Sequence, residues 1–190
     1  MENNLRPVAA LYVRADSIYK KKCIECYDIE RDARIYAGPY PVIAHPPCRA
    51  WGHLKGLAKP RPGEKDLALL AVQQVFEYGG VLEHPSGSSL FKEPRLLSTL
   101  GPDTFFMSVN QHWWGHKAEK RTLLYISGIT PKQMPAVSLS LDAITHVVVS
   151  SRFKSGRRKS LPELSKAARE RTPDRFAEWL IQVALLCRKK

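Results

Sequence analysis

The chain has 190 residues, 44% of them hydrophobic, which is enough for one domain with an apolar core and too little for two. Its 30 Lys and Arg residues against 18 Asp and Glu residues give a net charge of +12, which favours a polyanion such as nucleic acid as partner. No apolar stretch approaches the length of a membrane span and no signal pattern opens the chain, so we expect a cytoplasmic protein with no membrane partner.

The first half of the chain is predicted to alternate strands and turns around one long helix. We expect strands at residues 8–13, 23–27, 41–45 and 81–83, and a helix at residues 64–78 that Gly79 and Gly80 end. This order is typical of a parallel sheet covered by helices. Only about ten residues separate the first two strands, so the first crossover helix is expected to be short or missing.

The second half is predicted to add strands at residues 122–126 and 145–150 and helices within residues 162–186. Thr172 is the expected N-cap of a C-terminal helix at 172–187, whose apolar face belongs to the core and comprises Phe176, Leu180, Val183, Ala184 and Cys187. The sequence therefore predicts a single α/β domain over residues 1–190, with a compact Rossmann-like sheet flanked by helices.

The four cysteines, Cys23, Cys26, Cys48 and Cys187, are not expected to form a disulfide framework in a cytoplasmic protein. We interpret Cys23 and Cys26, a C-x-x-C pair without a second pair, as strand packing. A zinc site built from His45, Cys48 and His53 with His84, His112 and His116 is an alternative, but the spacings match no standard zinc signature. We therefore expect no metal.

The segment at residues 45–52 concentrates reactive groups at the end of a predicted strand, where ligands bind in doubly wound sheets. Two prolines precede Cys48 and fix the backbone, which suits a nucleophile. Neighbouring positive charge is expected to favour the thiolate. The residues of this turn expected to contact substrate are His45, Pro47, Arg49 and Trp51, with His45 and Arg49 also supplying that charge.

Glu83 ends the next strand, where partial burial is expected to raise its pKa and to let it donate or accept a proton. His84 and Ser86 follow it as further candidates for substrate contact. Gly87, between Ser86 and Ser88, forms a turn that offers backbone N–H groups, which is a weak indication of an anion site beside the simpler reading of a polar turn.

Two later segments combine positive charge with features of nucleic-acid binding. Trp114 and Lys120 are candidates for substrate contact, because aromatic faces interleaved with cations stack bases and neutralise phosphates. The basic loop at residues 151–160 is expected to bind phosphates through Arg152, Lys154, Arg157, Arg158 and Lys159.

Pro47-Cys48, Glu83 and the Lys120-Arg121 pair before residues 123–128 together resemble the Pro-Cys, Glu-Asn-Val and Gln-x-Arg-x-Arg blocks of cytosine carbon-5 DNA methyltransferases. The resemblance implies that Cys48 adds to C6 of a flipped-out cytosine, that Glu83 contacts N3 and the exocyclic amine, and that Arg121 steadies the intermediate. It spans residues 8–128, and the compact chain is similar to the methylase-like proteins carried by bacteriophages.

The chain departs from that family where S-adenosylmethionine binds. The family's Phe-x-Gly-x-Gly loop is replaced by Arg14-Ala15-Asp16-Ser17, which contains no glycine, while Asp28 ends the second strand, where an acid commonly binds a ribose. Asp16, Ser17 and Asp28 are therefore the candidate cofactor residues, and the cofactor itself stays open.

The sequence thus predicts a DNA base-modifying enzyme that acts on a pyrimidine through a covalent Cys48 adduct, encoded by a phage and working in its bacterial host. Two alternatives stay open: a catalytically inert nucleic-acid-binding or counter-defence protein, and an enzyme that modifies free nucleotides. The oligomeric state is not indicated.

Overall fold

A six-stranded mixed sheet forms the centre of the computed structural model, which describes residues 6–52, 55–56, 58–137, 139–149 and 160–189. The strands are β1 (Ala9–Leu11), β2 (Glu25–Tyr27), β3 (Val42–Ala44), β4 (Gly80–Pro85), β5 (Thr104–Asn110) and β6 (Arg121–Ser127). They are ordered β2-β1-β3-β4-β6-β5. The first four are mutually parallel, whereas β6 runs antiparallel to both β4 and β5.

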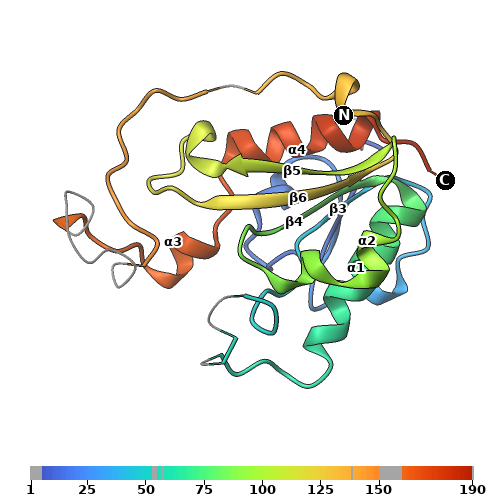
Figure 1. The fold of residues 1–190 in the computed structure, drawn as a ribbon, viewed down its shortest axis with the longest axis horizontal. Coiled ribbons are helices and arrows are strands. Elements are labelled where there is room, and N and C mark those ends of the chain that lie inside the picture. The colour runs from blue at the N-terminus through green and yellow to red at the C-terminus, as the bar shows by residue number, and fades with distance from the viewer. Residues whose placement is uncertain (1–5, 53–54, 57, 138, 150–159, 190) are drawn as a thin grey trace.

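Helices cover the two faces of the sheet (Figure 1). One face packs against α4 (Asp174–Leu186), and the other packs against α1 (Glu64–Tyr78) with the short α2 (Pro94–Leu97) beyond it. A further short helix, α3 (Lys166–Glu170), lies beside the edge at which β4 ends. The prediction of an α/β protein with a sheet flanked by helices is confirmed, and the architecture is compatible with a Rossmann-like domain.

The apolar pattern predicted the packing of α4 correctly and that of α1 in part, since Leu67 and Leu70 on the expected face of α1 are only partly buried. The expected helix at 64–78 is α1, which buries Ala68, Ala71 and Val75. The predicted apolar face of α4 is buried in full, from Phe176 to Cys187. No helix in the described part of the chain combines the length and apolar character needed to cross a membrane.

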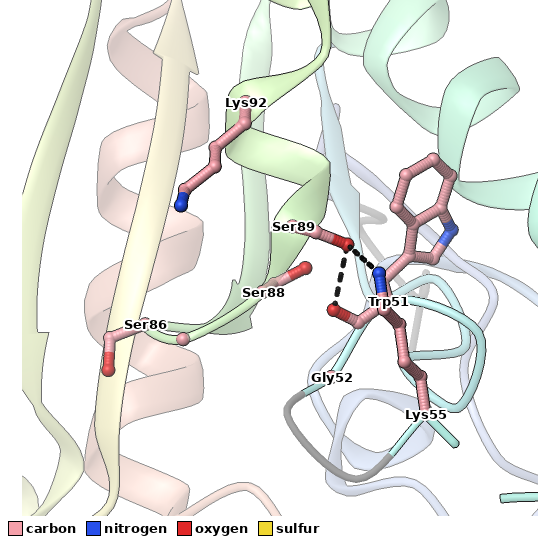
Figure 2. A pocket seen from close by; sticks show the side chains of 8 residues that line it. Trp51, Gly52, Lys55, Ser86, Ser88, Ser89 and Lys92 are labelled. Carbon is pink, nitrogen blue, oxygen red and sulfur yellow. Dashed lines mark hydrogen bonds between the residues drawn. The ribbon is translucent and has the colours of Figure 1, made fainter.

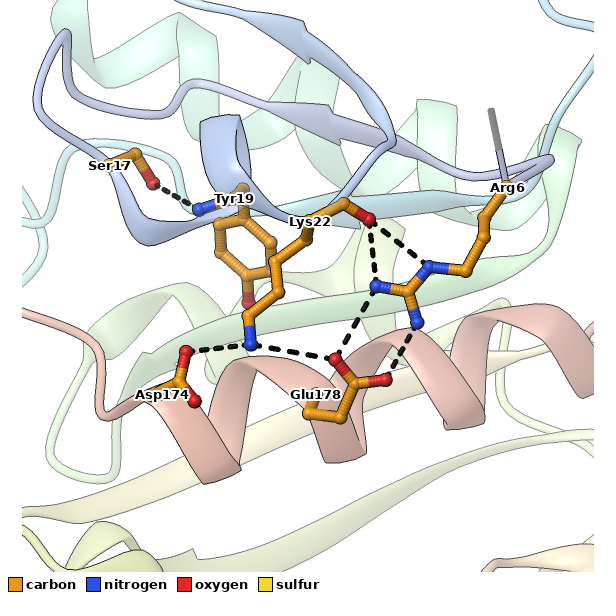
Figure 3. A network of polar contacts seen from close by, with 6 residues as sticks. All are labelled: Arg6, Ser17, Tyr19, Lys22, Asp174 and Glu178. Carbon is orange, nitrogen blue, oxygen red and sulfur yellow. Dashed lines mark hydrogen bonds and ion pairs between the residues drawn. The ribbon is translucent and has the colours of Figure 1, made fainter. Parts of the chain in front are cut away.

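The connection from β1 to β2 contains the 3-10 helix η1 (Ile18–Lys21), in which the Ser17 side chain accepts the Tyr19 backbone N–H. Figure 3 shows how side chains from this region are bound to α4. The ammonium of Lys22 lies 2.6 Å from Asp174 and 3.6 Å from Glu178, and Arg6 contacts Glu178 at 2.6 Å. These ion pairs bind the connection to the helix that covers one face of the sheet.

Two predictions in the second half are wrong. Residues 145–149 form no strand and contribute only an isolated bridge between Val147 and Glu163, while residue 150 lies outside the described residues. The place beside β6 is taken by β5, which the sequence analysis did not predict. The helix α4 begins at Asp174 with Pro173 as its N-cap, so Thr172 does not cap it.

The C-x-x-C pair does not lie within one strand. Cys23 precedes β2, is exposed and has φ +53°, whereas Cys26 lies in the strand and is half-buried. Only Cys26 therefore contributes to strand packing.

Gly80 is required by the close approach of β3 and β4. A Cβ atom at this position would lie 1.9 Å from the Val42 carbonyl oxygen, and the backbone has φ +130°.

We expect Gly80→Ala to lower the free energy of unfolding by more than about 4 kcal/mol, measured by urea titration followed by circular dichroism. Gly63→Ala is the control, because Gly63 also has positive φ (+74°) but open space around it. We expect it to cost about 1 kcal/mol, and equal losses in the two variants would contradict the steric explanation.

Candidate active site

His45 and Glu83 meet where the parallel strands β3 and β4 end. The register pairs Ala44 with Leu82, so the next residue of each strand points to the face covered by α4. The His45 Nδ1 atom lies 3.1 Å from Glu83 Oε2. Two residues that the sequence analysis named separately are therefore in direct contact at the carboxyl edge of the sheet.

The other Glu83 oxygen is bound from two segments distant in sequence. Gln111 Nε2 donates to Oε1 at 2.9 Å, and the Thr122 hydroxyl donates to the same atom at 3.2 Å. The side chain is only 13% exposed. A carboxylate has about four acceptor positions, so three protein donors leave room for about one more.

The hydrogen-bond chain continues through His45 to Tyr19. The Tyr19 hydroxyl lies 3.0 Å from His45 Nε2. Burial, followed by the charge of Glu83, raises the pKa of Tyr19 well above its usual range, so the phenol keeps its hydrogen and donates it to Nε2. Nδ1 then carries the ring hydrogen and donates to Glu83. The chain of donors is thus directed toward the carboxylate.

The pKa of Glu83 is lowered to about 2, which corrects the expectation of a raised value. Burial alone would raise it, but the His45 hydrogen bond and the positive charge of Lys120 outweigh burial. Glu83 is therefore ionised at neutral pH. It is suited to accept a hydrogen bond or to stabilise positive charge, and not to donate a proton.

Cys48 is exposed at the turn that follows Pro46 and Pro47. Its pKa is nevertheless raised, first because protein displaces part of the water around the sulfur and second because of the charge of Glu83. The expectation that Arg49 and His45 would favour the thiolate is therefore wrong. At neutral pH the group is a thiol.

Arg49 and Trp51 anchor the turn to α1. The Arg49 Nε atom lies 3.0 and 3.1 Å from the two oxygens of Glu64, in the first turn of that helix. Glu64 also accepts the Arg61 backbone N–H at 2.8 Å. The indole N–H of Trp51, which is buried, donates to the Lys65 carbonyl at 3.1 Å. The Arg49 charge and the Trp51 ring are thus used in fixing the loop that carries Cys48.

Neither His84 nor Ser86 forms a hydrogen bond with the Glu83 carboxylate in the described structure, although His84 and Glu83 interact electrostatically. The buried His84 ring packs edge-on against Phe91, and neither ring nitrogen has a hydrogen-bond partner among the described residues. The Pro47 backbone acts to raise the pKa of His84, although it forms no hydrogen bond of regular geometry with the ring. Burial lowers the pKa of His84 to about 4, so it is neutral at pH 7. Ser86 is exposed and lines a cleft of about 410 Å³.

Lys120, which precedes β6, and Arg121, its first residue, lie on opposite sides of the sheet. The Arg121 side chain is 73% exposed, and because neighbouring strand residues alternate, it points away from the face on which Thr122 reaches Glu83. The Lys120 charge lowers the pKa of both Glu83 and Cys48, which places it within electrostatic reach of the site. The structure brings Lys120 to the pair, and not Arg121.

Trp114 and the histidines near it have structural contacts. The Trp114 ring is buried. Its centroid lies 4.8 Å from the centroid of the Phe176 ring and 4.9 Å from that of Trp179. Nδ1 of His112 contacts the carbonyl of His116 at 2.6 Å. No three His, Cys, Asp or Glu side chains among the described residues are placed to hold a metal ion. His53, Arg152, Lys154, Arg157, Arg158 and Lys159 lie outside the described residues.

The candidate cofactor residues are engaged with their neighbours. Asp16 pairs with Arg14 at 2.8 Å, and Arg14 also pairs with Glu170 of α3. Asp28 follows β2 as predicted, but it lies 2.5 Å from the Lys20 ammonium and accepts the backbone N–H groups of Glu30 and Arg31 at 2.9 and 3.2 Å.

A cleft of about 370 Å³ at this place is lined by Val13, Arg14, Ala15, Asp16 and Ile29. Because the acids are paired, Ser17 caps η1 and no glycine lies in the loop, these residues do not fit S-adenosylmethionine.

Three residues of the site were not predicted. Thr122 carried a signal, since it alternates with buried Leu124 and Ile126 on one face of β6. Tyr19 follows the helix-capping Ser17 in the β1–β2 connection. Gln111 had no local signal, because it follows the unpredicted strand β5.

The chain matches no protein-family model, and comparison with curated proteins finds no significant match.

The lowered pKa of Glu83 makes the stability of the protein depend on acid. A depressed carboxyl pKa contributes stability that is complete above the unfolded value near 4.5 and is lost as the pH falls through about 2. We expect the free energy of unfolding of the wild type, relative to Glu83→Gln, to fall by about 3 kcal/mol over that range, since each pKa unit is worth about 1.4 kcal/mol. Urea unfolding at several pH values measures it. Glu30→Gln, which removes an exposed carboxylate, is the control, and a pH-independent difference for Glu83→Gln would contradict the lowered pKa.

The engaged residues around Arg14 and Asp28 lead to a binding prediction. We expect isothermal titration of the purified protein with S-adenosylmethionine to show weak binding or none, because binding would have to break ion pairs of both acids. A one-to-one site of micromolar affinity would overturn this expectation.

Proposed function

We propose that the chain is a DNA base-modifying enzyme of the compact, methylase-like kind carried by bacteriophages, and that Cys48 adds covalently to a cytosine. One observation carries the proposal: Cys48 is exposed on the turn that follows His45, whose ring contacts the ionised Glu83 at 3.1 Å. The net charge of +12 supports nucleic acid as the partner.

Glu83 is the group proposed to recognise the base. With three protein donors on the carboxylate, about one acceptor position is left, and the exocyclic amine of cytosine is a donor that matches it. A charged acceptor strengthens such a hydrogen bond. The directed chain from Tyr19 through His45 keeps the carboxylate in place for this contact.

The proposed reaction begins when the Cys48 thiol loses its proton to water and the sulfur forms a bond to C6. The electron pair of the C5–C6 double bond moves onto the ring, where the positive charge of Lys120 stabilises it. C5 then takes a proton from water. Reversal of these steps removes one hydrogen from C5 and breaks the S–C6 bond, so C5 hydrogen exchanges with solvent without any donor. We assign no donor group.

Exchange at C5 tests the proposal directly. DNA that carries tritium at C5 of cytosine should release it to water in the presence of the protein, and release should stop in Cys48→Ser. Glu83→Gln should slow it about 10- to 100-fold, the effect of losing a hydrogen bond to a charged group. The rate should rise with pH above neutrality, because the pKa of Cys48 is raised and the thiolate is the nucleophile.

Cys23→Ser is the matched control, because Cys23 is also exposed but precedes β2. It should leave the release of tritium unchanged. Release by Cys48→Ser at the wild-type rate would exclude covalent catalysis by Cys48. No release by the wild type, in buffer or in cell extract that supplies a donor, would leave a nucleic-acid-binding protein without this chemistry.

A further inference from the structure

A second cleft opens at the same edge of the sheet, between the loop after Cys48 and the segment after β4 (Figure 2). Its volume is about 410 Å³. It is lined by Trp51, Gly52, Lys55, Ser86, Gly87, Ser88, Ser89 and Lys92, and we call it the lysine–serine cleft.

The lining of the lysine–serine cleft is chemically one-sided. It contains two ammonium groups and three serines, and the residues that line it include no acid. Lys55 and Lys92 are exposed, and neither forms an ion pair with a carboxylate in the described part of the chain. Lys55 Nζ contacts only the Ser89 hydroxyl in this cleft, at 3.5 Å. Uncompensated positive charge beside the exposed Ser86 hydroxyl suits an anion that has several oxygens.

The two walls of the cleft are held together by hydrogen bonds. The Ser89 backbone N–H and hydroxyl both donate to the Trp51 carbonyl, at 2.9 and 3.2 Å. The Ser88 hydroxyl accepts the Leu90 N–H at 3.1 Å. The walls therefore keep their separation without a ligand, so little ordering would accompany binding.

One backbone turn connects the lysine–serine cleft to Cys48. The Cys48 carbonyl accepts the N–H groups of Trp51 and Gly52 at 3.0 and 2.8 Å. A ligand against Gly52 would therefore lie one chain turn from Cys48.

We propose that the lysine–serine cleft binds a phosphate group of the substrate that carries the target base. The inference rests on the proposed function for the identity of that substrate. Phosphate oxygens match the ammonium groups of Lys55 and Lys92 and the exposed Ser86 hydroxyl, and fixing the phosphate one turn from Cys48 would set the position of the base at the thiol. The phosphate belongs either to a DNA strand or to a mononucleotide.

The test is a charge-matched comparison of two double variants. Lys55→Gln/Lys92→Gln removes both charges from the cleft. Lys132→Gln/Lys189→Gln removes two charges at the opposite edge, where Lys132 follows the end of β6 and Lys189 lies against Tyr78 at the end of α1. Affinity for a short labelled DNA duplex is measured by fluorescence anisotropy over a range of salt. The slope of log affinity against log salt should become less steep by about 0.9 per lost phosphate contact in the cleft variant only.

A second probe separates the two sources of phosphate. If deoxycytidine monophosphate loses affinity for the cleft variant and DNA does not, the phosphate is that of a mononucleotide; if DNA loses affinity, it is that of a strand. Equal behaviour of the cleft and control variants toward both probes would overturn the inference. Release of tritium from C5 at saturating DNA reports the chemistry separately, so a salt effect without release would refute the proposed function and keep the cleft.

Discussion

A carboxylate that is largely excluded from water must be compensated by hydrogen-bond donors and positive charge, and at Glu83 this requirement ties the edge of the sheet together. His45 follows β3, Gln111 follows β5 and Thr122 is the second residue of β6, and each donates to the same carboxyl group. His45 is in turn hydrogen-bonded to Tyr19. Tyr19 lies in the connection that contains η1, and an ion pair between Lys22 and Asp174 holds this connection to α4. Displacing any of these segments would leave buried charge unpaired, so the position of the carboxylate is fixed by the fold as a whole.

The residues that surround Cys48 in sequence stabilise its loop and leave its chemistry to groups from elsewhere. Arg49 is bound to Glu64 and Trp51 to the Lys65 carbonyl, so the turn is fixed on the first turns of α1. The adjacent guanidinium interacts electrostatically with the thiol, but burial and the charge of Glu83 outweigh it. The pKa of the thiol is set by lost hydration, by Glu83 and by Lys120, which come from β4 and from the residue before β6. The reactivity of Cys48 is thus expected to depend on how a bound substrate changes the charge and hydration around the thiol.

The sequence was sufficient where the signal was periodic and local. The apolar spacing of residues 64–78 and of Phe176 to Cys187 predicted two helices, with the buried face of the second in full and that of the first in part. Cys48 and Glu83, which the strand ends were expected to bring together, lie within electrostatic reach of each other. The sequence failed where the outcome depended on partners distant in sequence. The lowered pKa of Glu83 requires His45 and Lys120, and the raised pKa of Cys48 requires burial and the charge of Glu83. Residues 145–149 are apolar enough for a strand, but β5 pairs with β6 in their place.

The direction of β6 decides which charge reaches the site. In a wholly parallel sheet, the start of a strand beside β4 would lie at the edge opposite the one where β4 ends. Because β6 is antiparallel, its register places Thr122 opposite Pro85, at the end of β4. Thr122 can then donate to Glu83, and the Lys120 ammonium comes within electrostatic reach of both Glu83 and Cys48. The segment that leads into the antiparallel strand β6 therefore supplies the positive charge of Lys120. The ends of the parallel strands β3 and β4 supply the imidazole, the thiol and the carboxylate at the same edge.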